Sequence, residues 1–461
     1  HGYSVLGFPA DELNDPGFGL DYHPEKKPTG NSELSRIAGF FGNLNYTYDN
    51  RYFADFSVRA DASSRFGADK RWAVFWSAGV GYNLHNEVFL KKLEWVSLLR
   101  LRASYGVTGG QNFNPYQAMT TYRFITDKWY GYGSGAEMLA LGNDDLKWQS
   151  TVQKNFGLDL GMWKDRLTLT FNYYHKLSEN SLTDVTLPPS LGFPSYKENL
   201  GEVVNEGWEF TLRGFVVKKE DFNIMLSVNG AQNNNKLKKI SNSLKAFNEE
   251  QDKQVENKVM ARYVEGQSLN TIWVVRSLGI DPANGKELFL DKNGKRTYDW
   301  NADDYVAEAT TDPRLYGNLG LGIFYRGFSL NTYVNYSLGE KAYNQTLVDR
   351  VENADKHYNC DRRVLYDRWH KPGDETFFKD VKDASVTRPT SRFVQKNNYL
   401  NMTSLNVAYE FNPRLLEPLR IKYLKLAFYM TDLFRISTMK AERGLDYPFA
   451  RTFTTSLQIR F

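Results

Sequence analysis

The sequence is poor in the features that mark disulfide-rich proteins, zinc proteins and helical membrane proteins. It has one cysteine, Cys360, in 461 residues, so the chain can form neither a disulfide framework nor a cysteine-based zinc site. It has no run of about 18 uncharged apolar residues, which excludes a membrane-spanning helix. The net charge of +4 is too small for this length to indicate nucleic acid as a partner. Residues 1–4 lack a signal-peptide pattern, and we expect the front of an exported gene product to be missing.

The sequence does contain long stretches in which apolar and polar residues alternate. Even positions from Tyr52 to Ala60 are apolar or aromatic, and odd positions from Asp55 to Asp61 are polar or charged. The same pattern recurs in residues 72–83, 99–107 and 452–461. One such segment would also fit a half-buried strand of a soluble sheet. About ten alternating residues, however, is the length that a tilted strand needs to cross a bilayer.

The links between these stretches alternate between short and long, as in outer-membrane barrels, which have short periplasmic turns and long external loops. Tyrosine and phenylalanine are frequent beside the short links, which is typical of an interfacial aromatic girdle. The short links include 49–50, 163–165, 218–220 and 326–327, and the long links cover 62–71, 108–147, 178–204, 233–314, 339–397 and 432–450.

The sequence therefore predicts an all-β fold, a transmembrane antiparallel β-barrel with long extracellular loops. We expect about thirteen strands, and single-chain bacterial barrels have an even number, so further N-terminal strands should exist. Residues 1–35 would be the remnant of an extracellular loop, and residues 36–461 the C-terminal portion of the barrel. The expected strands begin near residues 36, 51, 72, 97, 148, 165, 205, 221, 315, 328, 398, 420 and 451.

Several motifs, spread in order along the chain, resemble the SusC/RagA family of TonB-dependent nutrient transporters of Bacteroidetes outer membranes. They are Leu101–Asn112 followed by Pro115-Tyr116, Leu146–Thr151 with Asn155–Asp159, Tyr173–Lys176, Asn199–Gly201 with Asn205–Glu209, Gly279–Pro282 with Gly285, Ser391-Arg392-Phe393 with Tyr399-Leu400, and Tyr447–Arg451.

The resemblance implies a plug domain followed by a barrel of about 22 strands, of which this chain would hold the last thirteen. It also implies import of oligosaccharides or oligopeptides, with no cofactor, together with a SusD-like surface lipoprotein that caps the barrel. TonB would act through the missing plug, outer-membrane lipid would surround the barrel, and pairs of transporter and lid would be able to dimerise. The terminal aromatic residue Phe461 resembles the signal that the barrel-assembly machinery reads.

Aromatic residues in the long links are candidates for substrate binding, because sugar rings stack on aromatic faces. Trp129, Tyr130 and Tyr132 lie in a glycine-rich segment, and Trp300 and Trp369 lie in two other long links. The alternative is that these rings pack loops together or contact the lid. Aromatic loops suit glycans and charged loops suit peptides, so the substrate class stays open.

Other motifs indicate structure rather than chemistry. Asp291–Gly294 lacks the spacing of a calcium loop, and its Asn-Gly pair predicts a type I′ hairpin. His370 near Asp374 and Glu375 fits an exposed turn better than an acid–base site, and Asn233–Lys236 suggests a strand terminus. We therefore expect no catalytic residues and no metal site. An outer-membrane barrel enzyme or a surface adhesin are the alternatives to an importer.

Overall fold

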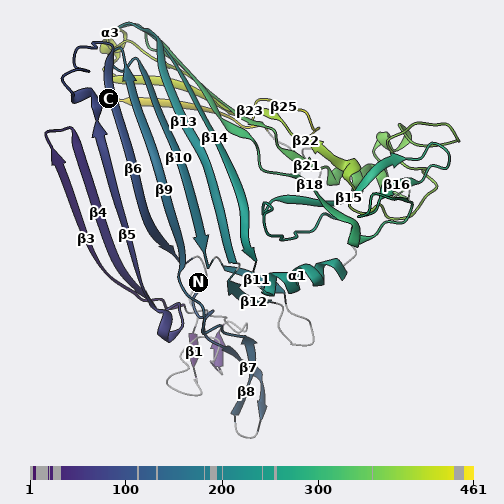
Figure 1. The fold of residues 1–461 in the computed structure, drawn as a ribbon. Coiled ribbons are helices and arrows are strands. Elements are labelled where there is room, and N and C mark those ends of the chain that lie inside the picture. The colour runs from purple at the N-terminus through teal and green to yellow at the C-terminus, as the bar shows by residue number, and fades with distance from the viewer. Residues whose placement is uncertain are drawn as a thin grey trace.

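The computed structural model describes residues 4–6, 19, 21–23, 33–111, 114–130, 133–180, 182–186, 195–199, 201–240, 242–253, 257–355, 357–440 and 451–461. Thirteen long strands in it form one continuous antiparallel sheet, curved into a wall (Figure 1). Within these residues, no helix is long and apolar enough to cross a membrane.

The sheet confirms all thirteen predicted strands, each beginning within a few residues of its expected start. From one edge to the other they follow chain order. They are β3 (Ile37–Tyr48), β4 (Tyr52–Ser63), β5 (Trp72–Asn83), β6 (Val96–Gly110), β9 (Gln149–Met162), β10 (Leu167–Glu179), β13 (Gly201–Lys218), β14 (Phe222–Ile240), β19 (Leu315–Tyr325), β20 (Phe328–Leu338), β23 (Tyr399–Glu410), β24 (Tyr423–Thr431) and β26 (Phe453–Arg460).

The register of the strands places one apolar and one polar face on the two sides of the wall. Val58 lies opposite Trp76, and Ser57 lies opposite Ser77, so the alternation of each strand matches that of its neighbour. Because directly opposed residues share a face, the apolar positions form one continuous outer surface. Its large side chains are exposed, as expected for a surface that faces hydrocarbon.

Tight turns at one end of the wall join the strands into hairpins. Asp49 and Asn50 both have positive φ, 51° each, and the Arg51 N–H donates to the Tyr48 carbonyl at 3.0 Å, the geometry of a type I′ turn. Arg326 and Gly327 also have positive φ. The sorting of links by length is not strict, because links 84–95 and 411–422 lie at this same end and are longer. The second contains α3 (Pro413–Leu416) (Figure 1).

The prediction that Asn233–Lys236 ends a strand is wrong, because β14 continues to Ile240. The Asn233 and Asn235 side-chain amides both donate to Asn205 Oδ1 on β13, at 3.1 and 2.9 Å. Tyr174 Oη donates to Asn233 Oδ1 at 3.0 Å from β10. A polar run can thus continue a sheet when amide side chains bond to one another across the strands.

Small elements occupy the long links. Two hairpins are β7 (Thr121–Tyr130) with β8 (Gly133–Ala140), and β11 (Leu182–Thr186) with β12 (Ser195–Asn199). The chain also forms α1 (Asn242–Lys253), a four-stranded sheet of β15 (Thr271–Ile280), β16 (Glu287–Leu290), β17 (Arg296–Thr297) and β18 (Tyr305–Thr310), and the pair β21 (Lys341–Tyr343) and β22 (Val394–Lys396). β25 (Arg435–Ser437) pairs with β23, and β1 (Ser4–Leu6) pairs with β2 (Asp21–His23).

The wall has two free edges, β3 and β26, in the part of the chain that the structure describes. Every residue of β3 is exposed. Phe461 follows β26 directly, at the end of the wall that carries α3, and 76% of its surface is exposed (Figure 1). Its predicted role as an assembly signal stays a prediction.

The two faces should respond differently to charge. Replacing Val58, near the middle of β4 on the apolar face, with arginine should destabilise the inserted barrel by about 2–4 kcal/mol, because the cation would lie in hydrocarbon. Ser57→Arg is the matched control, since Ser57 lines a cavity of about 430 Å³ on the polar face. The measurement is the amount of heat-modifiable protein in the outer membrane. Equal loss in both variants would contradict the assignment of the faces.

Candidate functional site

The polar face of the wall carries a network of side chains that spans four neighbouring strands. Arg102 Nε on β6 donates to Asp159 Oδ2 on β9 at 2.9 Å, and its Nη2 donates to Asn172 Oδ1 on β10 at 3.1 Å. The Asn172 amide donates to Glu209 Oε1 on β13 at 3.2 Å. Because these groups bond to one another, the wall stays polar and ordered, as in the lumen of a large barrel.

A folded body stands at the opposite end of the strands from α3 (Figure 1). It is formed by residues 257–314, after β14, and 339–398, after β20, and we call it the loop body. Its core is apolar and well buried, with a cluster in the second segment formed by Val348, Val351, Val364, Phe378 and Phe393. Val274 and Val275 of β15 are fully buried as well. These two long links are therefore packed structures of their own.

Backbone contacts join the two segments of the loop body. The Val275 N–H donates to the Pro389 carbonyl at 3.3 Å, and Val275 also forms a parallel bridge with Thr390. The Ser277 N–H donates to Ser391 Oγ at 2.9 Å. Residues 389–391 of the second segment thus lie along β15 of the first.

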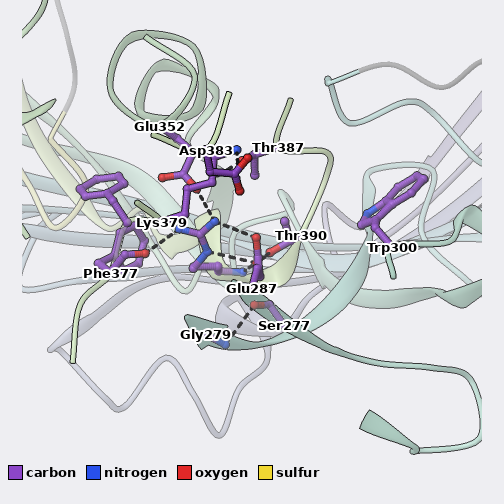
Figure 2. Close-up of polar contacts among 12 residues, drawn as sticks. Ser277, Gly279, Glu287, Trp300, Glu352, Phe377, Lys379, Asp383, Thr387 and Thr390 are labelled. Atoms are coloured by element: carbon purple, nitrogen blue, oxygen red, sulfur yellow. Dashed lines mark hydrogen bonds and ion pairs between the residues drawn. The ribbon is translucent and has the colours of Figure 1, made fainter. Parts of the chain in front are cut away.

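A buried cluster of charges, centred on Arg392, links the segments further. Arg392 Nη2 donates to Glu287 Oε2 at 2.7 Å and to Glu352 Oε1 at 2.6 Å, and its Nε donates to Glu287 Oε1 at 3.1 Å. Figure 2 shows Glu287 and Glu352 converging there from two sides. The Arg392 side chain is only 4% exposed and the Glu352 side chain 0%. We call Glu287, Glu352 and Arg392 the clasp.

Neighbouring groups complete the charge balance of the clasp. Arg368 is buried and donates to the backbone carbonyls of Val351, Glu352 and Lys379. Lys379 donates to Ser385 and lies 3.8 Å from Asp383. Three cations, at 368, 379 and 392, thus accompany three carboxylates, at 287, 352 and 383.

The environment shifts the pKa values of these cations. Burial lowers the pKa of Lys379 and of Arg368. Burial alone would also lower the pKa of Arg392, but the Glu287 and Glu352 carboxylates outweigh it, and the pKa is raised. Arg392 therefore stays charged, and its charge is neutralised by Glu287 of β16 and by Glu352 at the end of the helical turn Val348–Glu352.

Two of the aromatic residues predicted to bind substrate have their indole N–H groups engaged in loop contacts. Trp300 Nε1 donates to the Pro389 carbonyl at 3.1 Å, and its ring lies edge-on to Tyr305. Trp369 Nε1 donates to the Pro282 carbonyl at 2.9 Å. Both tryptophans join the two segments, and both remain partly exposed.

Two of the other three predicted binding residues, Trp129 and Tyr130, belong to β7 of the β7–β8 hairpin. Trp129 pairs with Ser134 and Tyr130 pairs with Gly133, which places both at the tip of the hairpin. Tyr132 and the side chains of Trp129 and Tyr130 lie outside the described residues. A substrate role for these five aromatic residues stays a prediction.

The family motif at Gly279–Pro282 with Gly285 forms a docking turn. The Pro282 carbonyl accepts from the Gly373 N–H at 2.8 Å as well as from Trp369. Gly285 has a φ of +73°, and a Cβ there would lie 2.6 Å from the Trp369 ring, so only glycine fits. This motif therefore serves contact between the two segments.

The motifs at Asp291–Gly294 and His370–Glu375 form turns in the structure. β16 and β17 form the predicted hairpin, but its turn is not type I′. A type I′ turn needs positive φ at both central residues, and Gly294 has positive φ whereas Asn293 does not. Asp291 Oδ1 instead accepts from the N–H groups of Asn293 and Lys295. Asp374 accepts from the N–H groups of His370 and Lys371, which lowers the pKa of its carboxyl. No group of three or more His, Cys, Asp or Glu side chains among the described residues could hold a metal ion.

The clasp was not predicted from the sequence, although one signal was present. Arg392 is the central residue of the Ser391-Arg392-Phe393 motif, in which a cation adjoins a phenylalanine that is fully buried in the structure. Glu287 is 105 residues away in the chain, and nothing in its neighbourhood indicates that partner.

The wall, its polar face and its external loops define a large outer-membrane β-barrel. Residues 3–433 match the family described as TonB dependent receptor-like, beta-barrel, and the chain belongs to this family. It is therefore part of a barrel of the bacterial outer membrane.

Curated relatives and solved structures agree with this family. The TonB-dependent receptor SusC of Bacteroides thetaiotaomicron is 28% identical over 474 residues, covering 95% of this chain and 45% of SusC. TonB-dependent receptor P3 of Formosa agariphila is 26% identical, covering 94% of this chain and 46% of P3. The RagAB peptide importer in its open-open state is 25% identical with a TM-score of 0.76, covering 95% of this chain and 49% of that one. The chain thus spans about half the length of the relatives that it matches.

Removing the central cation of the clasp should loosen the loop body. Arg392→Met leaves two buried carboxylates unpaired, and breaking such a pair costs about 3–5 kcal/mol. We expect much faster cleavage of the loop body by protease added to intact cells. Arg388→Met is the matched control, because Arg388 is exposed and lies over the Trp300 ring. Replacing all three clasp residues with methionine should restore part of the resistance, and equal cleavage of the two single variants would contradict the role of the clasp.

Proposed function

We propose that this chain is the C-terminal portion of a SusC-like TonB-dependent transporter, which imports oligosaccharides or oligopeptides across the outer membrane. Residues 36–461 would form the last thirteen strands, and residues 1–35 the end of an extracellular loop. The observation that carries the proposal is the continuous polar face of a thirteen-strand wall in a chain that belongs to this receptor family. The free edges β3 and β26 are where further strands would pair.

The polar face suits a lumen that a plug domain fills. Its side chains, from Arg102 to Glu209, are held in place by hydrogen bonds to one another, so they form an ordered polar surface that a plug can contact. A plug would contact this face and carry the segment that TonB pulls. Energy for import would reach the outer membrane only through that contact, because this membrane sustains no ion gradient of its own.

The loop body suits the docking of a SusD-like surface lipoprotein. It is a packed structure on the extracellular side, so it can present a fixed surface. Large apolar side chains of its residues 358–366 are strongly exposed, and Tyr358, Leu365 and Tyr366 are each at least 60% accessible. Exposed apolar groups of this kind are typical of a binding surface. A dimer of two transporter–lid pairs remains a prediction from the family resemblance.

The aromatic tip of the β7–β8 hairpin is the proposed contact for substrate. Trp129, Tyr130 and Tyr132 can stack on sugar rings or on the side chains of a peptide. Trp300 and Trp369 would add ring faces from the loop body, where their N–H groups already hold the segments together. An enzyme or an adhesin receives no specific support from the described residues.

The transporter proposal predicts loss of uptake when the hairpin tip is altered. Replacing Trp129, Tyr130 and Tyr132 together with alanine should reduce uptake of the oligomer at least about 10-fold, because stacking contacts worth about 0.5–1.5 kcal/mol each would be lost. The amount of barrel in the membrane should not change. Uptake is measured with labelled fragments in cells that depend on this gene, after a deletion strain has identified the nutrient. Growth of the deletion strain on every candidate nutrient would refute import.

The lid proposal predicts that changes to the exposed apolar residues 358–366 weaken binding of the lipoprotein. Leu365→Asp with Tyr366→Asp should weaken co-purification of the lipoprotein, because charge would be placed on the apolar docking surface. The hairpin-tip variant serves as the control, since it should keep the lipoprotein. Full retention of the lipoprotein by the aspartate variant would contradict docking at residues 358–366.

A further inference from the structure

An open groove lies on the outer, apolar face of the wall, at the end with the tight turns. Its volume is about 1130 Å³, larger than the roughly 300–1,000 Å³ typical of small-molecule pockets. Strands β10, β13 and β14 form its floor, and Trp95 and Trp163 stand beside it. Its apolar lining includes Leu167, Leu212 and Leu226. The groove is separate from the lumen and from the loop body.

The strand register establishes that the groove faces the membrane. Leu167 lies opposite Gly214, and Gly214 lies opposite Leu226, so the three residues share one face. Asn172 of the lumen network occupies an even position of β10, whereas Leu167 occupies an odd one. Successive side chains of a strand point to opposite faces. The groove is therefore open to hydrocarbon.

Gly214 leaves space in the floor of the groove because it has no side chain. A Cβ at this position would lie 3.1 Å from Leu167 Cδ1, so any larger residue would fill the space between Leu167 and Leu226. A bulge directly after it, between Phe215 and Val217, shifts the register of β13 against β14. Glycine and a bulge together thus interrupt an otherwise continuous row of side chains.

A strained turn forms the rim of the groove. Trp163, Lys164 and Asp165 all have positive φ, 53°, 57° and 59°, in a region that residues other than glycine rarely adopt. The turn is held from the adjoining hairpin, because Ser97 Oγ donates to Asp165 Oδ1 at 2.6 Å and the Trp163 N–H donates to the Trp95 carbonyl at 2.8 Å. Strain that neighbours maintain is typical of binding sites. Here it brings Trp163 and Lys164 to the groove.

The rim is positively charged. Lys164, Arg166 and Lys218 line it together with one carboxylate, Glu94. No carboxylate among the described residues pairs with any of the three cations. Lys218 Nζ lies 5.1 Å from the centre of the Phe215 ring. The groove therefore combines an apolar floor with three cations that no described carboxylate neutralises, at the level where the membrane meets water.

We propose that this groove binds an anionic phospholipid of the periplasmic leaflet, with an acyl chain along Gly214 and the phosphate at Lys164, Arg166 and Lys218. The tight turns mark the periplasmic end of an outer-membrane barrel, where the leaflet contains phospholipid. Basic pockets at the membrane surface bind anionic head groups. A further strand of the barrel would pair at β3 or β26, several strands away from the groove, and a plug would lie on the other face. The groove thus stays accessible to lipid in a complete transporter.

The test uses the full transporter, reconstituted in membranes of phosphatidylglycerol and phosphatidylethanolamine. After detergent extraction, native mass spectrometry identifies the lipid that the protein retains. The wild type should retain one phosphatidylglycerol in preference to phosphatidylethanolamine. Gly214→Leu should reduce this retention at least about 10-fold, because the leucine side chain would occupy the space beside Leu167 along which the acyl chain lies. Gly42→Leu is the matched control, since Gly42 also lies on the outer face and a Cβ there meets only Val58, at 3.8 Å.

A second set of variants tests the head group. Glutamate at Lys164, Arg166 and Lys218 should abolish the preference for phosphatidylglycerol, whereas glutamate at Arg414, Arg420 and Lys422, at the same end of the wall, should preserve it. Equal retention in Gly214→Leu and Gly42→Leu, no preference in the wild type, or a protein segment found in the groove would overturn the proposal.

A fluorescence experiment tests the proposal without Gly214→Leu, in case that variant fails to insert. Brominated phosphatidylglycerol should quench the fluorescence of Trp163 more strongly than brominated phosphatidylethanolamine does. The Trp163 signal is measured as the difference between the wild type and Trp163→Phe, and equal quenching by the two lipids would overturn the proposal.

Discussion

The hydrogen bonds between neighbouring strands are the interaction on which the rest of the structure depends. Inside a bilayer no water can satisfy a backbone N–H or C=O group, so each strand must find its partners in the strands beside it. This requirement explains the unbroken chain-order pairing from β3 to β26 and the tight turns that join hairpins at one end. It also fixes the two faces, because a slip by one residue would turn the apolar positions of a strand toward the lumen.

Outside the hydrocarbon the same chain is stabilised differently. The loop body buries charges, and the clasp of Glu287, Glu352 and Arg392 is satisfied only when its two segments come together. A buried ion pair is weak evidence for stability, but each member is costly to leave alone, so such a cluster favours one arrangement of the loops over others. The hydrogen bonds that the indole N–H groups of Trp300 and Trp369 donate across the two segments favour this same arrangement of the loops.

The sequence predicted the wall well because the signal for a membrane strand is local. Residues 72–83 alternate within themselves, and the observed strand β5 has these bounds. The prediction failed at Asn233–Lys236, because the acceptor of the hydrogen bonds that Asn233 and Asn235 donate, Asn205 Oδ1, lies on a different strand. It also gave the wrong turn type at Asn293-Gly294, where Asp291 organises the backbone instead.

The candidate site was less predictable than the wall, for a physical reason. Trp300 and Trp369 could be identified as loop aromatics, but their contacts with Pro389 and Pro282 lie 89 and 87 residues away in the chain. Glu287 and Arg392 are likewise brought together only by the packing of β15 against residues 389–391. Contacts of this kind depend on the three-dimensional arrangement, and no periodicity in the sequence encodes them.

The joining of residues 257–314 and 339–398 has a mechanical consequence. Since the two segments share a backbone bridge, a clasp and two tryptophan hydrogen bonds, neither can swing without carrying the other. The two segments of the loop body therefore constrain each other, and they join the wall directly at β19, β20 and β23. Rotation of the loop body must be absorbed where it joins the wall. Gly339, with a φ of +81° directly after β20, lies at such a joint, where its N–H donates to Asn398 Oδ1 at 2.7 Å.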